Sequence, residues 1–355
     1  MHLKPALFLG GFSFLITLCQ ISFAEPTFTV VCQLEERPGN PAVTPDGTIY
    51  ISMHPFDKPE YKVMQIQNGT AIPYPNKEIS RNQAAVIGIQ ATQDGTLWWL
   101  DMGSDQISPK LVGWDTQQNK LKAIHVIPKE VCVSNSFHQD FAIDEKRSKA
   151  FIADMSRGNL IDASEPAIVV VDLKTGLSRR LLSGNKRFQP GDTPLIAEGK
   201  PMKTKGPDGK IHTIKLGLNP IAIDPEHAWV YFSTMTAGNL FRISAKTLGD
   251  FSKSEIEIEK SIEIYAEKPS SDGIAVGRGG KVYITDVDNS MISIADSTGV
   301  HPWSTDARLI WPDGVYVAPD ESVVVTINQL HRASAFNGGK SLAEPPYIVA
   351  RIFDK

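Results

Sequence analysis

Polar residues recur at one position of a repeated strand pattern, just before an apolar segment. Along the chain they are Asn40, Gln139 with Asp140, Asn219, Asp272 and Asp313, while the second repeat offers Gly88 or Gln90. Carboxylate and amide oxygens that converge from several repeats are hard ligands of the kind that calcium prefers. They also serve as general bases and as hydrogen-bonding partners for a small polar ligand. A single Asp or Asn before a strand often only caps backbone groups, so the prediction depends on the recurrence.

Three further residues are candidates for the same site. His138 directly precedes Gln139, and a histidine at a channel mouth can move protons near neutral pH, although most loop histidines do not. Trp311, two residues before Asp313, is the aromatic side chain expected closest to the site. Asn328, in the segment Thr-Ile-Asn-Gln-Leu, is expected to contact a ligand.

The elements that must position these residues are six strand–turn–strand repeats. Examples are GIQATQDGTLWWLDMG, SDGIAVGRGGKVYITDVDN and WPDGVYVAPDESVVVTINQ, in which β-branched or aromatic runs flank a tight turn. A strand-built repeat of about fifty residues is typical of a propeller blade. The sequence therefore predicts an all-β, single-domain, six-bladed β-propeller, with the polar positions in a ring at one mouth of its central channel.

Two segments stand outside the repeats. TFTVVCQL (Thr27–Leu34) and PYIVARIF (residues 346–353) are expected to pair and so close the ring. Residues 183–217, rich in Gly, Pro and Lys, form a long insertion after the third repeat. Long loops of this kind are usually functional or mobile, so it is either a cover over one propeller face or a tolerated surface insertion.

The first 24 residues predict a cleaved signal peptide and therefore a secreted or periplasmic protein. Lys4 is followed by a short apolar run over residues 6–18 and by a small-residue site that ends at Ala24. The propeller is accordingly expected over residues 25–355, with no membrane span. Cys32 and Cys132 then remain, either as a disulfide or as two thiols that never meet.

Composition and missing motifs exclude several functions. The formal net charge of −4 without a basic cluster argues against nucleic acid as a partner. The chain contains no Gly-x-Ser-x-Gly, His-Glu-x-x-His or Cys-x-x-Cys motif and no phosphate-binding glycine loop. Serine hydrolase, zinc protease, thiol redox and nucleotide-dependent chemistry are therefore disfavoured.

The order of these segments resembles the major royal jelly protein and Yellow family. The resemblance runs from about residue 39 to residue 351 and is most specific in WVYFSTMTAGNLFRISAKTL. It implies a secreted six-bladed propeller. Within that family, some Yellow relatives are linked to dopachrome isomerisation and some salivary relatives bind biogenic amines.

The chain is more distantly similar to the gluconolactonase and senescence-marker propellers. Those proteins hold a divalent ion with a glutamate, two asparagines and an aspartate at the channel mouth. Asn219 and Asp272 fit that pattern and would be the metal ligands here. Asn40 falls near the expected glutamate, and Gln139-Asp140 replaces the second asparagine and its neighbour. The resemblance thus implies one calcium-like ion with two of its four ligands altered.

Three functions remain open on these grounds. The first is a binding protein for a small polar or aromatic ligand, in which Asn40, Gln139, Asn219, Asp313, Asn328 and Trp311 contact the ligand. The second is an enzyme. It would be a metal-assisted lactone hydrolase, with Asp272 or Asp140 activating water, or an isomerase of oxidised catechols that uses a ring carboxylate or His138. The third is a structural or protein-binding role.

Overall fold

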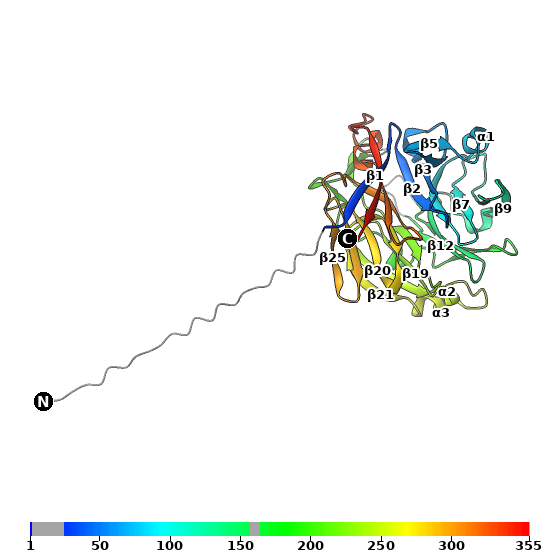
Figure 1. Cartoon of the computed structure of the whole chain (residues 1–355). Helices are drawn as coiled ribbons and strands as arrows, with labels where there is room; N and C mark the ends of the chain where they lie inside the picture. Colours follow the sequence, from blue (N-terminus) through cyan, green and yellow to red (C-terminus); the bar gives the residue numbers. More distant parts are fainter. Residues whose placement is uncertain (2–24, 157–163, 207, 355) are drawn as a thin grey trace.

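Six four-stranded antiparallel sheets are arranged in a ring, which confirms the predicted six-bladed β-propeller (Figure 1). This computed structural model describes residues 1, 25–156, 164–206 and 208–354 of the 355-residue chain. Apart from Met1, the predicted signal peptide lies outside these residues. No helix in the described ranges is long and apolar enough to cross a membrane.

Each blade contributes one strand to the lining of the channel, and neighbouring inner strands contact one another around the whole ring. The inner strands are β2 (Pro38–Val43), β6 (Val86–Ala91), β10 (His138–Asp144), β18 (Leu218–Ile223), β22 (Ser271–Val276) and β26 (Pro312–Val317). All six start at the same mouth, called here the amino-end mouth, and finish at the opposite one, the carboxyl-end mouth.

The remaining strands follow outward in sequence order in the first five blades, whereas the outer strand of the last blade is β1. The second strands are β3 (Ile49–Met53), β7 (Thr96–Asp101), β11 (Lys149–Asp154), β19 (Trp229–Thr234), β23 (Val282–Asp286) and β27 (Val323–Ile327). The third strands are β4 (Val63–Gln67), β8 (Lys110–Asp115), β12 (Ala167–Asp172), β20 (Gly238–Ser244), β24 (Met291–Asp296) and β28 (Tyr347–Phe353). The outer strands are β5 (Thr70–Pro73), β9 (Lys120–Val126), β13 (Ser178–Leu181), β21 (Glu263–Lys268), β25 (Gly299–Ser304) and β1 (Thr27–Leu34).

The ring is closed by strands from the two ends of the chain, as the sequence predicted. β1 pairs antiparallel with β28, so that Thr27 lies opposite Phe353 and Leu34 opposite Tyr347. Figure 1 shows β1 beside the carboxyl-terminal strand. The last blade therefore contains both termini of the propeller, and β28 is not left with an unpaired edge.

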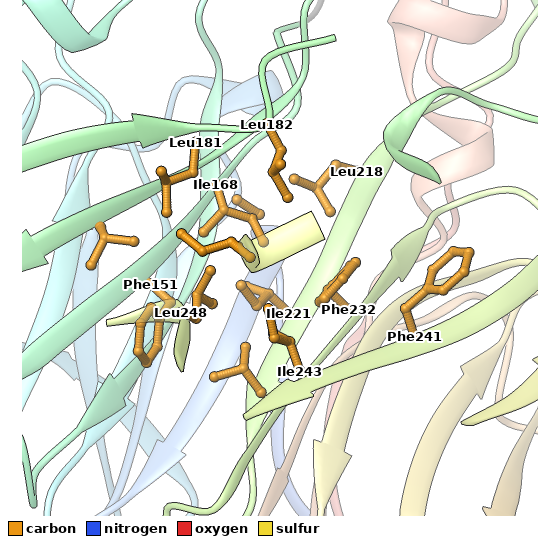
Figure 2. Packing of buried hydrophobic residues seen from close by; sticks show 14 of the residues in the cluster. Phe151, Ile168, Leu181, Leu182, Leu218, Ile221, Phe232, Phe241, Ile243 and Leu248 are labelled. Atoms are coloured by element: carbon orange, nitrogen blue, oxygen red, sulfur yellow. The ribbon is translucent and has the colours of Figure 1, made fainter. Parts of the chain in front are cut away.

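Apolar side chains fill the spaces between blades. Figure 2 shows the cluster between the third and fourth blades, where Phe151, Ile168 and Leu218 meet Ile221 and Phe232. All five side chains are fully buried, and each such burial contributes about 1.5–3 kcal/mol. Because every blade packs against two neighbours in this way, the ring holds the channel-lining strands in fixed positions.

Short helices and hairpins occupy the connections. The helices are α1 (Lys77–Arg81), α2 (Ala245–Leu248) and α3 (Glu255–Lys260). The insertion over residues 183–217 forms two small hairpins, from β14 (Ile196–Ala197) with β15 (Lys200–Pro201) and from β16 (Lys203–Lys205) with β17 (Ile211–Thr213). Cys32 and Cys132 are both free thiols, so the structure has the second of the two arrangements considered.

Candidate functional site

A β-bulge interrupts every inner strand near its start. The register against the second strand shifts between Pro38 and Pro41, Val86 and Ile89, His138 and Asp140, Leu218 and Ile221, Ser271 and Ile274, and Pro312 and Val315. Bulges re-aim side chains and are common beside functional sites. The predicted ring residues of five blades lie in these bulges, which explains how one position of the repeat can serve one site.

Hydroxyl groups from the second strands brace three of the bulges. Ser52 Oγ accepts the backbone N–H of Asn40 at 2.9 Å. Thr285 Oγ1 accepts the N–H groups of Asp272 at 3.2 Å and of Gly273 at 2.8 Å. Thr326 Oγ1 accepts the N–H of Gly314 at 3.0 Å and donates to the carbonyl of Gly39 in the neighbouring blade at 2.5 Å. These residues were not predicted from the sequence; the signal that marks them is a lone Ser or Thr inside an otherwise apolar second strand.

Three carboxyl groups come together beneath the amino-end mouth. Asp140, Asp272 and Asp313 are 5%, 4% and 3% exposed, although each comes from a different blade. Electrostatic repulsion connects Asp313 to both Asp272 and Asp140. Asn40 Nδ2 reaches across from the first blade and lies 3.4 Å from Asp140 Oδ1. The site is therefore a buried acidic cluster with amide neighbours.

Asp272 is held by two donors. Asn219 Nδ2 lies 3.2 Å from its Oδ1, and Trp311 Nε1 lies 2.9 Å from its Oδ2. Trp311 adopts a left-handed backbone conformation with φ of 56°, which is unusual for a bulky residue and is often found at functional sites. The ring of His331 stacks on the indole, with 5.4 Å between ring centroids.

Asp313 belongs to a second group of contacts that includes a buried arginine. Asn328 Nδ2 donates to Asp313 Oδ2, and the backbone carbonyl of Asn328 accepts a hydrogen bond from Arg37. Arg37 is 1% exposed, and its Nε also bonds to Asp57 at 2.9 Å. Arg37 was not predicted from the sequence, because this residue precedes the first repeat and belongs to no motif.

Burial controls the protonation of the three carboxyl groups. It raises the pKa of Asp140 to about 7 and the pKa of Asp272 to about 6. It also raises the pKa of Asp313 well above its ordinary value, with repulsion from Asp272 as the second cause. The cluster therefore changes its charge between weakly acidic and neutral pH.

The bulge of the second blade carries Ile87 and Gly88 and so offers no polar side chain to the cluster. A Cβ atom at Gly88 would lie only 3.0 Å from the carbonyl oxygen of Gln139 and 3.2 Å from the Cα of Asp140. Gln90, the other candidate in this blade, lines a pocket at the carboxyl-end mouth instead. Gly88 thus lets the backbone of the third blade approach closely, and Asn40 reaches Asp140 across it.

His138 and Gln139 directly precede Asp140 in β10. His138 is buried, and its Nε2 is 3.8 Å from Asp154 Oδ2, a carboxylate that also accepts a hydrogen bond from Arg180 at 2.6 Å. Burial lowers the pKa of His138. Gln139 is half-buried in the bulge of β10. The carboxylate facing His138 is therefore Asp154 of the second strand.

The insertion covers the amino-end mouth. Leu195, Ala197, Met202, Ile214 and Leu216 from the insertion are buried in one apolar cluster with residues that follow propeller strands. The propeller side of this cluster consists of Met155, Met235, Val287, Trp311, Leu330 and Ala333. Because Trp311 also bonds to Asp272, the apolar cover lies directly against the acidic cluster.

An ion pair connects the insertion to the last blade. Glu198, between the paired strands β14 and β15, forms an ion pair with Arg332. One of its oxygens also lies 3.1 Å from Nε2 of His331, the residue that stacks on Trp311. The tip of the insertion is thereby linked through two rings to Asp272.

The donor set fits a bound metal poorly. Both oxygens of Asp272 already accept hydrogen bonds, and Asn219 turns its amide nitrogen, not its oxygen, toward this carboxylate. Within the described part of the chain, no three His, Cys, Asp or Glu side chains are grouped so that they could hold a metal ion. Asn219 and Asp272 lie together as predicted, but their arrangement is that of a hydrogen-bonded pair.

Several solved structures share this fold. The chain is similar to a gluconolactonase from Xanthomonas campestris, with a TM-score of 0.57 and 11% identity, covering 93% of this chain and 90% of that one. It is also similar to regucalcin, a calcium-binding protein from Agrobacterium tumefaciens, with a TM-score of 0.53 and 14% identity over 94% and 96% of the two chains. Virginiamycin B lyase from Staphylococcus aureus gives a TM-score of 0.51 at 14% identity over 93% and 99%. At such identities the likeness shows the fold alone.

Sequence relationships are more specific than the shared fold. No curated protein matches the chain. A family model described as major royal jelly protein matches residues 84–332, from just before the second inner strand to the cover contacts at Arg332. This match spans more than half of the chain and includes Asp140, Asn219, Asp272, Asp313 and Asn328. The chain therefore belongs to the major royal jelly protein family.

Proposed function

We propose that this protein binds a small polar or aromatic ligand at the amino-end mouth, with a cationic group of the ligand facing Asp140, Asp272 and Asp313. One observation carries the proposal: three carboxyl groups from three blades are buried and lie close enough to repel one another electrostatically. Buried like charges are unfavourable unless they are protonated or meet a positive charge. A ligand cation would provide that charge.

The apolar cover supports a ligand with an aromatic or aliphatic body. Three methionines, Met155, Met202 and Met235, belong to the cluster above Asp272, and Phe56 and Phe336 pack against it. Methionine adapts its shape to irregular partners and makes favourable contacts with aromatic rings. A ligand that is positively charged at one end and apolar at the other would match the three aspartates on one side and the apolar cluster on the other.

Ligand entry requires the cover to move. Asp140, Asp272 and Asp313 are each 5% exposed or less, so a molecule cannot reach them while residues 183–217 stay in place. We propose that the insertion acts as a lid and that the Glu198 contacts to His331 and Arg332 hold it closed.

The test is calorimetric titration of tyramine, an aromatic amine, into a chain that begins at Glu25. We expect saturable binding at one site that strengthens as the pH rises from 5.5 to 7.5, because ionised carboxylates attract the ammonium group more strongly. Asp272→Asn should weaken binding at least about tenfold, or about 1.4 kcal/mol. The exposed Asp105→Asn serves as the matched control and should bind like the parent chain.

Other ligands distinguish a cationic organic ligand from an uncharged ligand and from a calcium ion. Failure of tyramine, dopamine and their N-acetyl derivatives to bind at any pH would refute a cationic ligand. Equal affinity for tyramine and its N-acetyl derivative would show that the carboxyl groups do not recognise a charge. Saturable calcium binding that is lost in Asp272→Ala would replace the organic ligand with an ion.

A second candidate function rests on Asp140. Its pKa of about 7 suits a group that accepts and returns a proton near neutral pH, as an isomerase of oxidised catechols requires. Turnover of dopachrome by the parent chain, lost in Asp140→Asn with the fold retained, would favour the enzyme. Unchanged turnover in that variant would assign the activity to another source.

Export belongs to the same proposal. The predicted signal peptide and the family relationship both support a secreted protein. We expect the protein recovered from the medium or periplasm of expressing cells to begin at Glu25. An uncleaved, cell-retained chain would contradict this.

A further inference from the structure

The carboxyl-end mouth of the channel holds a second cavity. Two adjoining pockets of about 290 Å³ and 150 Å³ share Thr92, Gln93, Val276, Tyr316 and Val317 among their lining residues. All six inner strands or their final residues contribute to this lining. The lining reaches inward to Ile274 and Val315, two residues beyond Asp272 and Asp313 and about 7 Å of strand away, and it includes none of the three aspartates of the acidic cluster. The cavity is therefore separate from the acidic cluster.

Its floor is apolar and its side carries aromatic rings. Val276 and Val317 end two inner strands. Tyr316 precedes Val317, and its hydroxyl donates to the carbonyl of Ala91 in the second blade at 3.0 Å. Tyr283 lines the outer part of the cavity and stands edge-to-face against Trp303, with ring centroids 4.9 Å apart. A flat ligand could place one face on this floor.

The cations at the rim are already paired. Arg278 Nε lies 3.1 Å from Glu321 Oε1, and Lys281 Nζ lies 3.9 Å from Asp354 Oδ2. All four residues line the larger pocket. An anionic ligand would have to displace these carboxylates, which lowers any gain from its charge.

Two carboxylates on the opposite side accept hydrogen bonds from backbone N–H groups. The carboxylate of Glu145 accepts the backbone N–H of Gln93 at 3.0 Å. Asp224 Oδ1 accepts the N–H groups of Ala228 at 2.6 Å and of Trp229 at 3.0 Å. Both carboxylates line the smaller pocket and keep lone pairs for further donors. The pocket lining therefore presents many strong donors and acceptors, with its two cations paired and these two carboxylates hydrogen-bonded to backbone N–H groups.

We infer that the carboxyl-end mouth is a second binding site, for a neutral polyhydroxylated ligand such as a monosaccharide or the end of an oligosaccharide. Hydroxyl groups donate and accept at once, so they bridge paired cations and carboxylates without separating them. The C–H face of a sugar ring fits the floor of Val276, Val317 and Tyr316. The volume is near the lower limit of about 300 Å³ for ligand pockets, which suits one or two sugar units.

The experiment is saturation-transfer NMR followed by calorimetry on the chain from Glu25, with glucose, N-acetylglucosamine, mannose and maltose as probes. We expect at least one sugar to bind saturably. Arg278→Ala and Lys281→Ala should each weaken it at least about fivefold, since charge-assisted hydrogen bonds to these groups are lost. Arg278 is exposed and Lys281 is half-buried at the surface, so folding should be retained, and Lys246→Ala is the matched surface control.

Three results would overturn the inference. The first is no saturable binding of any of these sugars. The second is sugar binding that survives both rim variants but is lost in Asp272→Asn, which would place the sugar at the amino-end mouth. The third is tighter binding of benzoate or tyramine than of any sugar, with the same sensitivity to the rim variants. Because the two mouths are tested by different variants, failure here leaves the amino-end proposal intact.

Discussion

At the scale of single residues, Asp272 shows how burial and hydrogen bonding compete. Donors from Asn219 and Trp311 favour its ionised form, yet burial still raises its pKa to about 6. An unfolded aspartate ionises near pH 4, so the folded chain binds more protons than the unfolded chain between about pH 4 and pH 6. The stability that Asp272 contributes is complete below pH 4 and is lost as the pH rises through 6.

Replacing Asp272 with Asn should therefore stabilise the chain without ligand at pH 7.5. The pKa of Asp272 is about two higher in the folded chain than in the unfolded chain, which corresponds to about 3 kcal/mol. This value is the upper limit of the expected gain in unfolding free energy. The amide of Asn219 can turn to accept from the new side chain, so the local hydrogen bonds survive. Urea denaturation between pH 4 and pH 8 measures the effect, and a variant less stable than the parent at pH 7.5 would contradict it.

At the scale of elements, the bulges depend on hydroxyl groups from neighbouring strands. Thr285 Oγ1 accepts the N–H groups of Asp272 and Gly273 and donates to the carbonyl of Gly273. Valine has nearly the same shape but cannot make these bonds. Thr285 is fully buried, so the two N–H groups would be left without their partner.

Thr285→Val should lower the free energy of unfolding by about 1–3 kcal/mol and weaken ligand binding at the amino-end mouth. Denaturation and tyramine titration measure the two effects. Thr298→Val, in an exposed turn where Thr298 bonds to Asp296, is the matched control. Loss of stability with unchanged tyramine affinity would show that the bulge does not position Asp272.

The insertion yields a second prediction at this scale. Glu198→Gln removes the ion pair with Arg332 and weakens the contact with His331. Exposed ion pairs contribute up to about 1 kcal/mol, so amide exchange over residues 195–202 and 214 should accelerate up to about fivefold. Hydrogen-exchange mass spectrometry measures this, and Asp192→Asn, which removes an exposed pair with Lys215, is the control. Equal protection in both variants would mean that apolar contacts alone hold the insertion.

The sequence predicted the elements better than it predicted how they place side chains. The ring positions Asn40, Asn219 and Asp272 could be found because the repeat aligns them against an apolar core. The bulges could not be found, since they depend on which second-strand hydroxyl meets which backbone group. Arg37 and Glu198 were also hidden, because their partners Asn328 and Arg332 are brought near them only by ring closure and by folding of the insertion.

At the scale of the whole molecule, stability depends on the pairing of β1 with β28, the seam that closes the ring. β1 is the outer strand of the last blade, and it buries Cys32 and Leu34 against that blade and its neighbour. Without it, β28 would present an unpaired edge to solvent. The same seam brings the ends of the propeller together, since Thr27 and Phe353 are paired.

A chain that begins at Glu35 should lose several kcal/mol of unfolding free energy and aggregate through the open edge. A circular permutant that joins residue 354 to residue 25 and opens at the exposed Asn119 turn should keep the full ring. Calorimetric melting compares the two with the parent chain. A truncated chain that melts like the parent would show that β1 is dispensable.

Gly88 makes the second blade and the third blade depend on each other's sequence. A side chain at residue 88 would come too close to the backbone of Gln139 and Asp140. A mutation in the second blade would therefore displace the carboxyl group of Asp140 in the third blade. The effect of substituting Gly88 should therefore depend on which residue occupies position 140, so we expect the two positions to be epistatic.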